Sequence, residues 1–166
     1  MSSDKRESLR VELETTRQGF YALADSLSPE DWTKPTPNPA WNVGEMMFHI
    51  TVAPRFLSED LRMIRYLGRT LYPPGFIFHR FNKWYTRHGA RQYTLATIKQ
   101  AYDKAHARTL QALDSVGDDE WHKSARYPGW DPMLSGTVTI EQLFHYVSRH
   151  FEAHAAEIRQ SIRKSP

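Results

Sequence analysis

Residues 139–159 read TIEQLFHYVSRHFEAHAAEIR, and this stretch carries the strongest structural signal in the chain. Thr139 followed three residues later by Gln142 is a helix-capping signature, in which each side chain bonds the backbone N–H of the other residue. Beyond this cap, apolar residues recur at steps of four and seven, the spacing that lines one face of a helix. They are Leu143, Val147, Phe151, Ile158 and Ile162. The pattern predicts one long helix with a buried face.

Two further stretches show the same helical spacing. The first runs over about residues 4–27, and the second runs over about residues 94–116, where Gly117 provides a natural helix end. Between residues 28 and 41 the chain contains four prolines, which forbid a regular helix there. These features predict two more helices and a polar linker after the first of them.

A fourth helix is predicted to begin sharply after Asn42. The Asn42 side chain can accept a backbone N–H as the cap, and Glu45 stands at the third helical position, as in a capping box. Apolar residues continue the helical pattern toward Gly68. Pro54 lies within this pattern and lacks a backbone N–H, so we expect a kink in the helix near it.

Two long connections, at about 69–93 and 118–138, join the predicted helices, and both contain prolines, glycines and large aromatic residues. Loops of this length in a compact protein are commonly functional or carry short helices of their own. The sequence shows no convincing strand pattern and no internal repeat. It therefore predicts an all-α protein with a single domain over residues 1–166, a four-helix bundle with long crossover connections.

The composition is that of a globular protein, with 40% apolar residues, 25% charged residues and a net charge of +3. No run of 18 apolar residues could span a membrane, and the charged N-terminal stretch lacks the apolar core of a signal peptide. We therefore expect a cytoplasmic protein without a membrane partner. The small charge excess also argues against a dedicated nucleic-acid-binding protein.

Two of the eight histidines, His150 and His154, stand four residues apart in the last helix, so both rings could reach one metal ion. They share the side of the helix that carries the apolar residues, where buried ring nitrogens need partners. An alternative is that one ring bonds a carboxylate and the other is exposed. His49 is the best candidate for a third ligand, although a single histidine on an apolar face is more often a hydrogen-bonded core residue. His145 should point away from His154, about 180° around the helix.

Three pieces of the chain together resemble the DinB-like superfamily of metal-binding four-helix bundles. They are LSPEDW at residues 27–32, PAWNVGEMMFHI at residues 39–50, and the stretch 139–159. Family members typically have a tryptophan and a small residue before a helix cap, a histidine in the second helix, and HxxxH in the last. The resemblance implies that His49, His150 and His154 bind a divalent metal. It also implies thiol-dependent transfer or isomerisation chemistry on small molecules.

Three imidazoles on one ion leave at least one coordination position open, which is the arrangement of catalytic centres. Zinc is the first expectation, with nickel or iron as alternatives, because imidazole binds all three. Glu157, three residues after His154, is the candidate catalytic residue that orients a ligand or moves a proton, unless it is an exposed helix charge. The chain has no cysteine, so any thiol must be an external low-molecular-weight cofactor.

The largest concentration of basic residues lies at residues 79–91, interleaved with aromatic residues. Trp84, Arg87 and Arg91 from this segment, together with Trp130, are predicted to bind the substrate at the mouth of a pocket, the alternative being surface packing. The leading interpretation is a metal-dependent enzyme of transferase type that acts on a small molecule. The alternatives are a metal-dependent hydrolase and a non-catalytic bundle that works through protein contacts. A homodimer is also expected, since symmetric pairs are the commonest oligomers.

Overall fold

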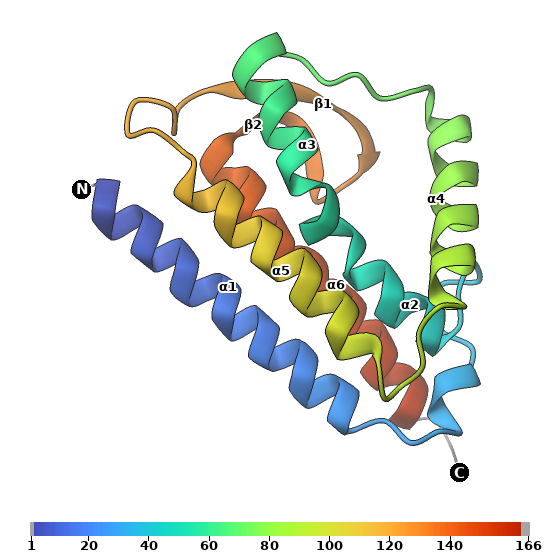
Figure 1. Cartoon of the computed structure of the whole chain (residues 1–166). Coiled ribbons are helices and arrows are strands. Elements are labelled where there is room, and N and C mark those ends of the chain that lie inside the picture. The colour runs from blue at the N-terminus through green and yellow to red at the C-terminus, as the bar shows by residue number, and fades with distance from the viewer. Residues whose placement is uncertain (1, 164–166) are drawn as a thin grey trace.

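The computed structural model describes residues 2–163, and Figure 1 shows its course. The chain forms, in order, α1 (Ser2–Asp25), a short 3-10 helix (Asp31–Thr33), α2 (Val43–Ile50), α3 (Val52–Leu67), α4 (Gly75–Ala90), α5 (Ile98–Asp114), β1 (Ser124–Asp131), β2 (Leu134–Thr139) and α6 (Ile140–Arg163). None of the helices in this described part is long and apolar enough to cross a membrane.

The predicted four-helix bundle is confirmed, and it consists of α1, α3, α5 and α6. Both α1 and α3 pack against α5 and α6 (Figure 1). Each helix turns its apolar side to the common core, as the spacing of apolar residues predicts. Representative core residues from the four helices, each at most 3% exposed, are Leu13, Leu61, Leu113 and Val147. A second buried apolar cluster surrounds α2 at one end of the bundle.

The helix predicted to begin after Asn42 is divided into α2 and α3 at Thr51. Pro54, the third residue of α3, has no N–H to offer the carbonyl group of Ile50, so the helical ladder is interrupted there. The Thr51 hydroxyl instead donates to the carbonyl group of Phe48 at 2.7 Å, which closes α2. The predicted interruption is therefore confirmed, and it lies about one turn before the proline. It leaves α2 as a separate short helix.

Residues 124–139 form an antiparallel hairpin, so the expectation of a chain without strands was wrong. The strand β1 contains Pro128 and Gly129, which weaken a strand signal, and the pairing register shifts between Tyr127 and Asp131. This irregularity obscures the alternation of apolar and polar residues that identifies a strand. The hairpin packs against α3 and α6. Its buried side consists of Ala125, Tyr127, Leu134 and Val138.

The connection 69–93 carries α4, in line with the expectation that so long a loop contains a helix. Figure 1 shows α4 at the edge of the molecule, beside α2. Gly89 lies so close to Phe48 of α2 that a Cβ at this position would stand 2.2 Å from the phenyl ring. At the other end of α4, the indole of Trp130 covers Gly75 in the same way, at 2.9 Å. Two glycines thus allow close packing at both ends of α4.

Candidate metal centre

A double cap holds the first turn of α2 and so determines where His49 lies. Asn42 accepts a hydrogen bond from the Glu45 N–H at 2.8 Å, and the Glu45 carboxylate accepts one from the Asn42 N–H at 3.0 Å. Gly44 packs against the indole of Trp32, which would stand 2.5 Å from a Cβ at this position. His49 follows one turn later and is buried, with 6% of its surface exposed.

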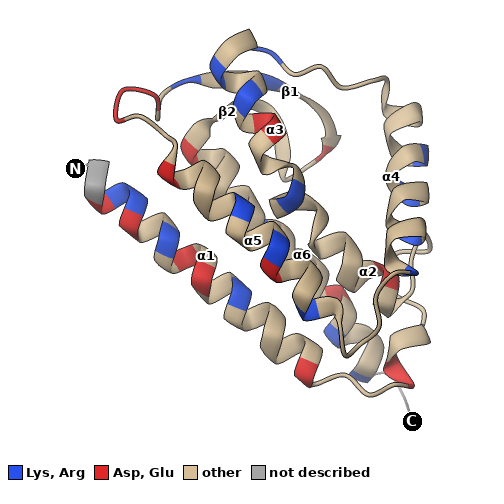
Figure 2. Cartoon of the chain, viewed as in Figure 1, with Lys and Arg blue, Asp and Glu red and all other residues tan. Residues whose placement is uncertain are grey.

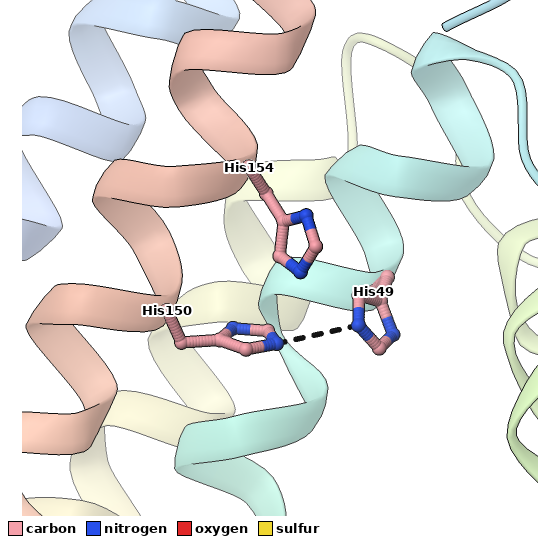
Figure 3. A group of neighbouring side chains, drawn as sticks. All are labelled: His49, His150 and His154. Atoms are coloured by element: carbon pink, nitrogen blue, oxygen red, sulfur yellow. Dashed lines mark hydrogen bonds between the residues drawn. The ribbon is translucent and has the colours of Figure 1, made fainter. Parts of the chain in front are cut away.

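His49 from α2 and His150 and His154 from α6 point toward one another (Figure 3). The Nε2 atoms of His49 and His150 are 3.3 Å apart, and one ring nitrogen of each histidine lies within 4.8 Å of the other two. Nitrogen ligands at about 2.0–2.1 Å from a tetrahedral zinc ion are themselves about 3.3–3.4 Å apart. The spacing of these three rings therefore fits a shared divalent ion.

Burial keeps the three imidazoles neutral. It lowers the pKa of His49 to about 3, with a smaller effect from His154, and it lowers the pKa of His150 well below its usual value. The pKa of His154 is also lowered by burial, although the carboxylates of Glu157 and Asp131 oppose this effect. A neutral imidazole keeps the lone pair that binds a metal. The cluster is therefore a set of nitrogen donors at neutral pH.

The protein itself does not satisfy these nitrogens. Each neutral imidazole has one N–H and one nitrogen lone pair. In the 3.3 Å contact between the Nε2 atoms of His49 and His150, one ring must donate its N–H to the other, so this contact satisfies only one of the two lone pairs. The Nδ1 atoms of His150 and His154 are buried without a hydrogen-bond partner among the described residues. Buried polar atoms without partners are rare in native proteins. A cation at the centre would accept the converging Nε2 lone pairs together, with the Nδ1 atoms carrying the protons.

Thr86 of α4 orients the ring of His49. Its hydroxyl oxygen, fully buried, lies 3.3 Å from His49 Nδ1. When this oxygen accepts the Nδ1–H, the Nε2 lone pair is left free to face the other two histidines. The indole of Trp41 stacks on the same ring, with 4.1 Å between the ring centroids. The sequence drew no attention to Thr86, because nothing in it shows that α4 folds back onto α2.

Glu157 and His145 lie where the helical spacing places them. A carboxylate oxygen of Glu157 is 3.6 Å from His154 Nδ1, and its second oxygen is buried without a hydrogen-bond partner in the part of the chain that is described. His145 points away from the cluster, and its Nδ1 lies 2.7 Å from the Glu12 carboxylate on α1. The predicted opposite orientation of His145 is confirmed.

Three of the four predicted substrate-binding residues lie on the exposed side of α4 or directly after it. Trp84, Arg87 and Arg91 surround a shallow depression of about 380 Å³ that is lined by α4 residues and by Arg91, the cap at the end of this helix. Arg87 also donates to the carbonyl group of Ala40 at 2.9 Å, and lies 3.7 Å from the Glu45 carboxylate. The depression that these three side chains surround is not lined by any histidine of the cluster.

Trp130, the fourth predicted residue, belongs to another region. It lies on β1 and packs against Phe78 near the beginning of α4, with 5.2 Å between the ring centroids. It also contacts Tyr72 of the linker before α4. Trp130 does not line the depression on α4. The four predicted residues therefore do not line one common pocket in the structure.

A polar pair that the sequence analysis missed lies beside the histidines. The ring of Tyr146 is 5.3 Å from that of His150, and its hydroxyl donates to Asp131 at 2.7 Å. The second carboxylate oxygen of Asp131 accepts the Met133 N–H at 2.8 Å, which holds it at the hairpin turn. Tyr146 stands four residues before His150, so helical spacing could have indicated it. No sequence signal indicates Asp131, because the hairpin brings it there.

Comparison with known proteins agrees with this architecture. The family model of the DinB superfamily matches residues 12–158. The crystal structure of the mycothiol-dependent maleylpyruvate isomerase is similar, with a TM-score of 0.67 and 11% identity over 95% of this chain and 60% of that chain. A histidine-to-alanine mutant of that enzyme has a TM-score of 0.68, with the same identity and coverage.

At 11% identity this likeness shows a shared fold, and the chain spans only 60% of the length of the isomerase. No curated protein sequence matches the chain. The family model, in contrast, covers most of the sequence, from the first helix through all three clustered histidines. The chain therefore belongs to the DinB superfamily.

Proposed function

We propose that this protein is a divalent-metal-dependent enzyme that acts on a small molecule together with an external low-molecular-weight thiol. The observation that carries the proposal is the convergence of three buried, neutral imidazoles from α2 and α6, whose nitrogens lie within 4.8 Å of one another. Zinc is the proposed ion, and nickel and iron are the alternatives, because all three accept imidazole ligands.

In this proposal His49, His150 and His154 hold the ion. A divalent ion bound in this way keeps an open coordination position, where it lowers the pKa of a bound thiol or water and polarises a substrate. Thr86 holds His49 in the tautomer that presents Nε2 to the centre. Glu157 is the proposed catalytic residue. Its carboxylate can accept the Nδ1 proton of His154, which orients that ring and provides a place for a proton.

We assign the polar contacts of the substrate to Tyr146 and Asp131, because Tyr146 packs on His150 and Asp131 is held beside it. Both groups offer hydrogen bonds next to the proposed ion, on the side of the cluster that faces the hairpin. Trp84, Arg87, Arg91 and Trp130 stay predictions as substrate-binding residues, and their separation from the histidines does not favour this role.

A thiol is proposed for two reasons. The isomerase with the similar fold is named as mycothiol-dependent, and the resemblance of the chain to the DinB-like superfamily implies thiol chemistry. The present chain contains no cysteine, so the sulfur atom must come from a separate molecule. Transfer of a group to the thiol and thiol-assisted isomerisation both fit such a site. A cytoplasmic location, where small thiols are kept reduced, and a homodimer complete the proposal.

The test is elemental analysis of untagged protein purified without chelator, followed by reactions of small electrophiles with and without added thiols. We expect one divalent ion per chain, its loss in His49→Ala and His154→Ala, and turnover that depends on the thiol. His145→Ala is the matched control, because this histidine bonds Glu12 away from the cluster. If the substrate is instead hydrolysed without any thiol, the enzyme is a metal-dependent hydrolase and the thiol-dependent activity is contradicted. A protein without stoichiometric metal would contradict the proposal.

A further inference from the structure

A second chemical feature of the molecule lies on the outer side of α4 and does not depend on the histidine cluster. The stretch 61–102 contains eight Lys and Arg residues and no Asp or Glu. The remaining 124 residues contain 14 basic and 19 acidic residues. The net charge of +3 for the whole chain therefore conceals a basic segment of net charge +8. Figure 2 shows Lys and Arg on α4 and no acidic residue on that helix.

The same part of the molecule exposes most of the large apolar side chains on the surface. Among the described residues nine large hydrophobic side chains are exposed, and eight of them lie between residues 56 and 84. The ninth is Val11 on α1. Exposed apolar side chains that gather in one region indicate a binding surface, whereas scattered ones need no explanation. The eight are Phe56, Tyr66, Leu67, Leu71, Phe76, Ile77, Phe81 and Trp84.

On α4 the basic and apolar side chains form one continuous surface, which we name the α4 face. It consists of Phe76, Ile77, Arg80, Phe81, Lys83 and Trp84. The four apolar residues of the face are between 44% and 70% exposed. The opposite side of the helix packs inward, where Thr86 contacts His49 and Gly89 lies under Phe48. The α4 face is therefore turned outward by contacts that hold the helix in place.

We propose that the α4 face binds an anionic lipid surface, with the helix lying flat in the interface. Aromatic and aliphatic side chains beside Lys and Arg on one helix are the composition of interfacial amphipathic helices. The charge is complementary to anionic headgroups, which attract basic residues near the surface. A helix of 16 residues is about 24 Å long, so the whole face can contact the bilayer at once.

The shape of the face favours a lipid surface over a nucleic acid or an apolar peptide. The depression on α4 is lined by residues of that helix and by its cap Arg91, so no second helix or strand forms a groove with it. A single nucleic-acid strand is usually held in a basic groove, and an apolar helix in a groove between elements. Ile77, an aliphatic residue, gives no platform for base stacking. The expectation of no membrane partner rested on the missing membrane span, which an interfacial helix does not require.

The test is co-sedimentation of the full chain with phosphatidylcholine vesicles that do or do not contain phosphatidylglycerol, at about 0.15 M ionic strength. We expect binding only to the anionic vesicles. Arg80→Glu with Lys83→Glu should weaken it at least about 25-fold, which is about fivefold for each cation. The matched control is Lys104→Glu with Arg108→Glu on α5. It changes the net charge equally at exposed positions outside the α4 face, and we expect binding to remain within about threefold of wild type.

Apolar contact is tested separately with Trp84→Ala, for which we expect about tenfold weaker vesicle binding, against Val11→Ala as the exposed control. The proposal is overturned if anionic and neutral vesicles bind alike, or if the two charge-reversal variants lose binding equally. It is also overturned if a single-stranded oligonucleotide binds more tightly than the anionic vesicles through the same residues. The proposal is likewise overturned if the protein forms a dimer that buries Trp84 and prevents vesicle binding. In that case the partner of the α4 face is a second copy of the chain.

Discussion

Five histidines of this protein fall into two groups that differ in what their ring nitrogens contact. His145 lies 2.7 Å from the carboxylate of Glu12, and His106 lies 3.2 Å from that of Glu14. Each of these rings has an acidic partner on α1. At the centre, in contrast, His49 and His150 face each other across 3.3 Å, and His154 completes the cluster.

This difference separates histidines with a structural role from those with a chemical one. A ring hydrogen-bonded to a carboxylate, as His145 is to Glu12, has a partner for that nitrogen whether it is neutral or protonated. Three imidazoles that face one another leave nitrogen lone pairs without a hydrogen-bond donor. Protonation does not supply one, because burial opposes it. The comparison therefore predicts that substitutions in the central cluster strongly change metal binding and the free energy of unfolding, and that substitutions in the pairs with α1 change them little.

The largest expected effect is the stabilisation of the fold by metal. An ion that binds only the folded chain adds about 4 kcal/mol to the free energy of unfolding at about 1,000 times its Kd. We expect thermal unfolding to show this increase for wild type and for His145→Ala when zinc is added. We expect no increase for His150→Ala. An equal response of the two variants would remove the distinction between the groups.

Next in size is the response of the metal-free protein to acid. The pKa of His49 is about 3 in the folded state and 6.5 when the chain is unfolded, so the unfolded state binds more protons between these values. The free energy of unfolding should therefore fall as the pH falls from 6.5 toward 3. His49 alone would contribute about 3 kcal/mol of this loss at pH 4.5.

Urea unfolding in chelator at pH 7 and pH 4.5 measures this acid response. His49→Gln should lose less stability on acidification than wild type, because its amide does not titrate. His145→Gln, at a partly exposed position on the other side of α6, should keep the slope of wild type. A wild-type slope in His49→Gln would show that the buried ring does not resist protonation.

A smaller effect is expected at Thr86, which contacts the centre through His49. Thr86→Val removes the oxygen at nearly the same volume, and we expect metal affinity to fall about 10- to 100-fold. Thr86→Ser keeps the hydroxyl group and should stay close to wild type. The measurement is a competition titration with a coloured chelator. If both variants bind metal like wild type, the threonine does not orient the ring.

The smallest effect is expected at the partner of His145. Glu12→Ala removes a partly exposed contact, so the free energy of unfolding should change by less than about 1 kcal/mol. Metal content should not change at all. A loss of metal in Glu12→Ala would place the two groups of histidines in one connected network.

The sequence allowed the bundle and the three histidines to be predicted because both depend on spacing within a helix. The four-residue step from His150 to His154 determines their common side in any straight helix. His49 was indicated by its position four residues after Glu45 of the Asn42 capping box, a local feature that the structure confirms. The resemblance to the DinB-like superfamily then joined the two stretches.

The remainder depends on contacts between distant segments, which spacing does not encode. The hairpin was missed because Pro128 and Gly129 interrupt its alternating pattern. Asp131 was missed for the same reason, because it lies on this hairpin. Thr86 was missed because the return of α4 to α2 depends on packing, including the close approach of Gly89 to Phe48. Trp84 and Trp130 were predicted in one place and lie in two, because aromatic composition does not show where a side chain packs.

X-ray absorption at the metal edge, on protein loaded with one equivalent of zinc, tests the central claim most directly. The account predicts three imidazole nitrogens at about 2.0–2.1 Å in wild type and in His145→Ala. It predicts one imidazole fewer, or loss of the metal, in His49→Ala and in His150→Ala. A spectrum with fewer than three imidazoles in wild type, or one that is unchanged in His150→Ala, would contradict it.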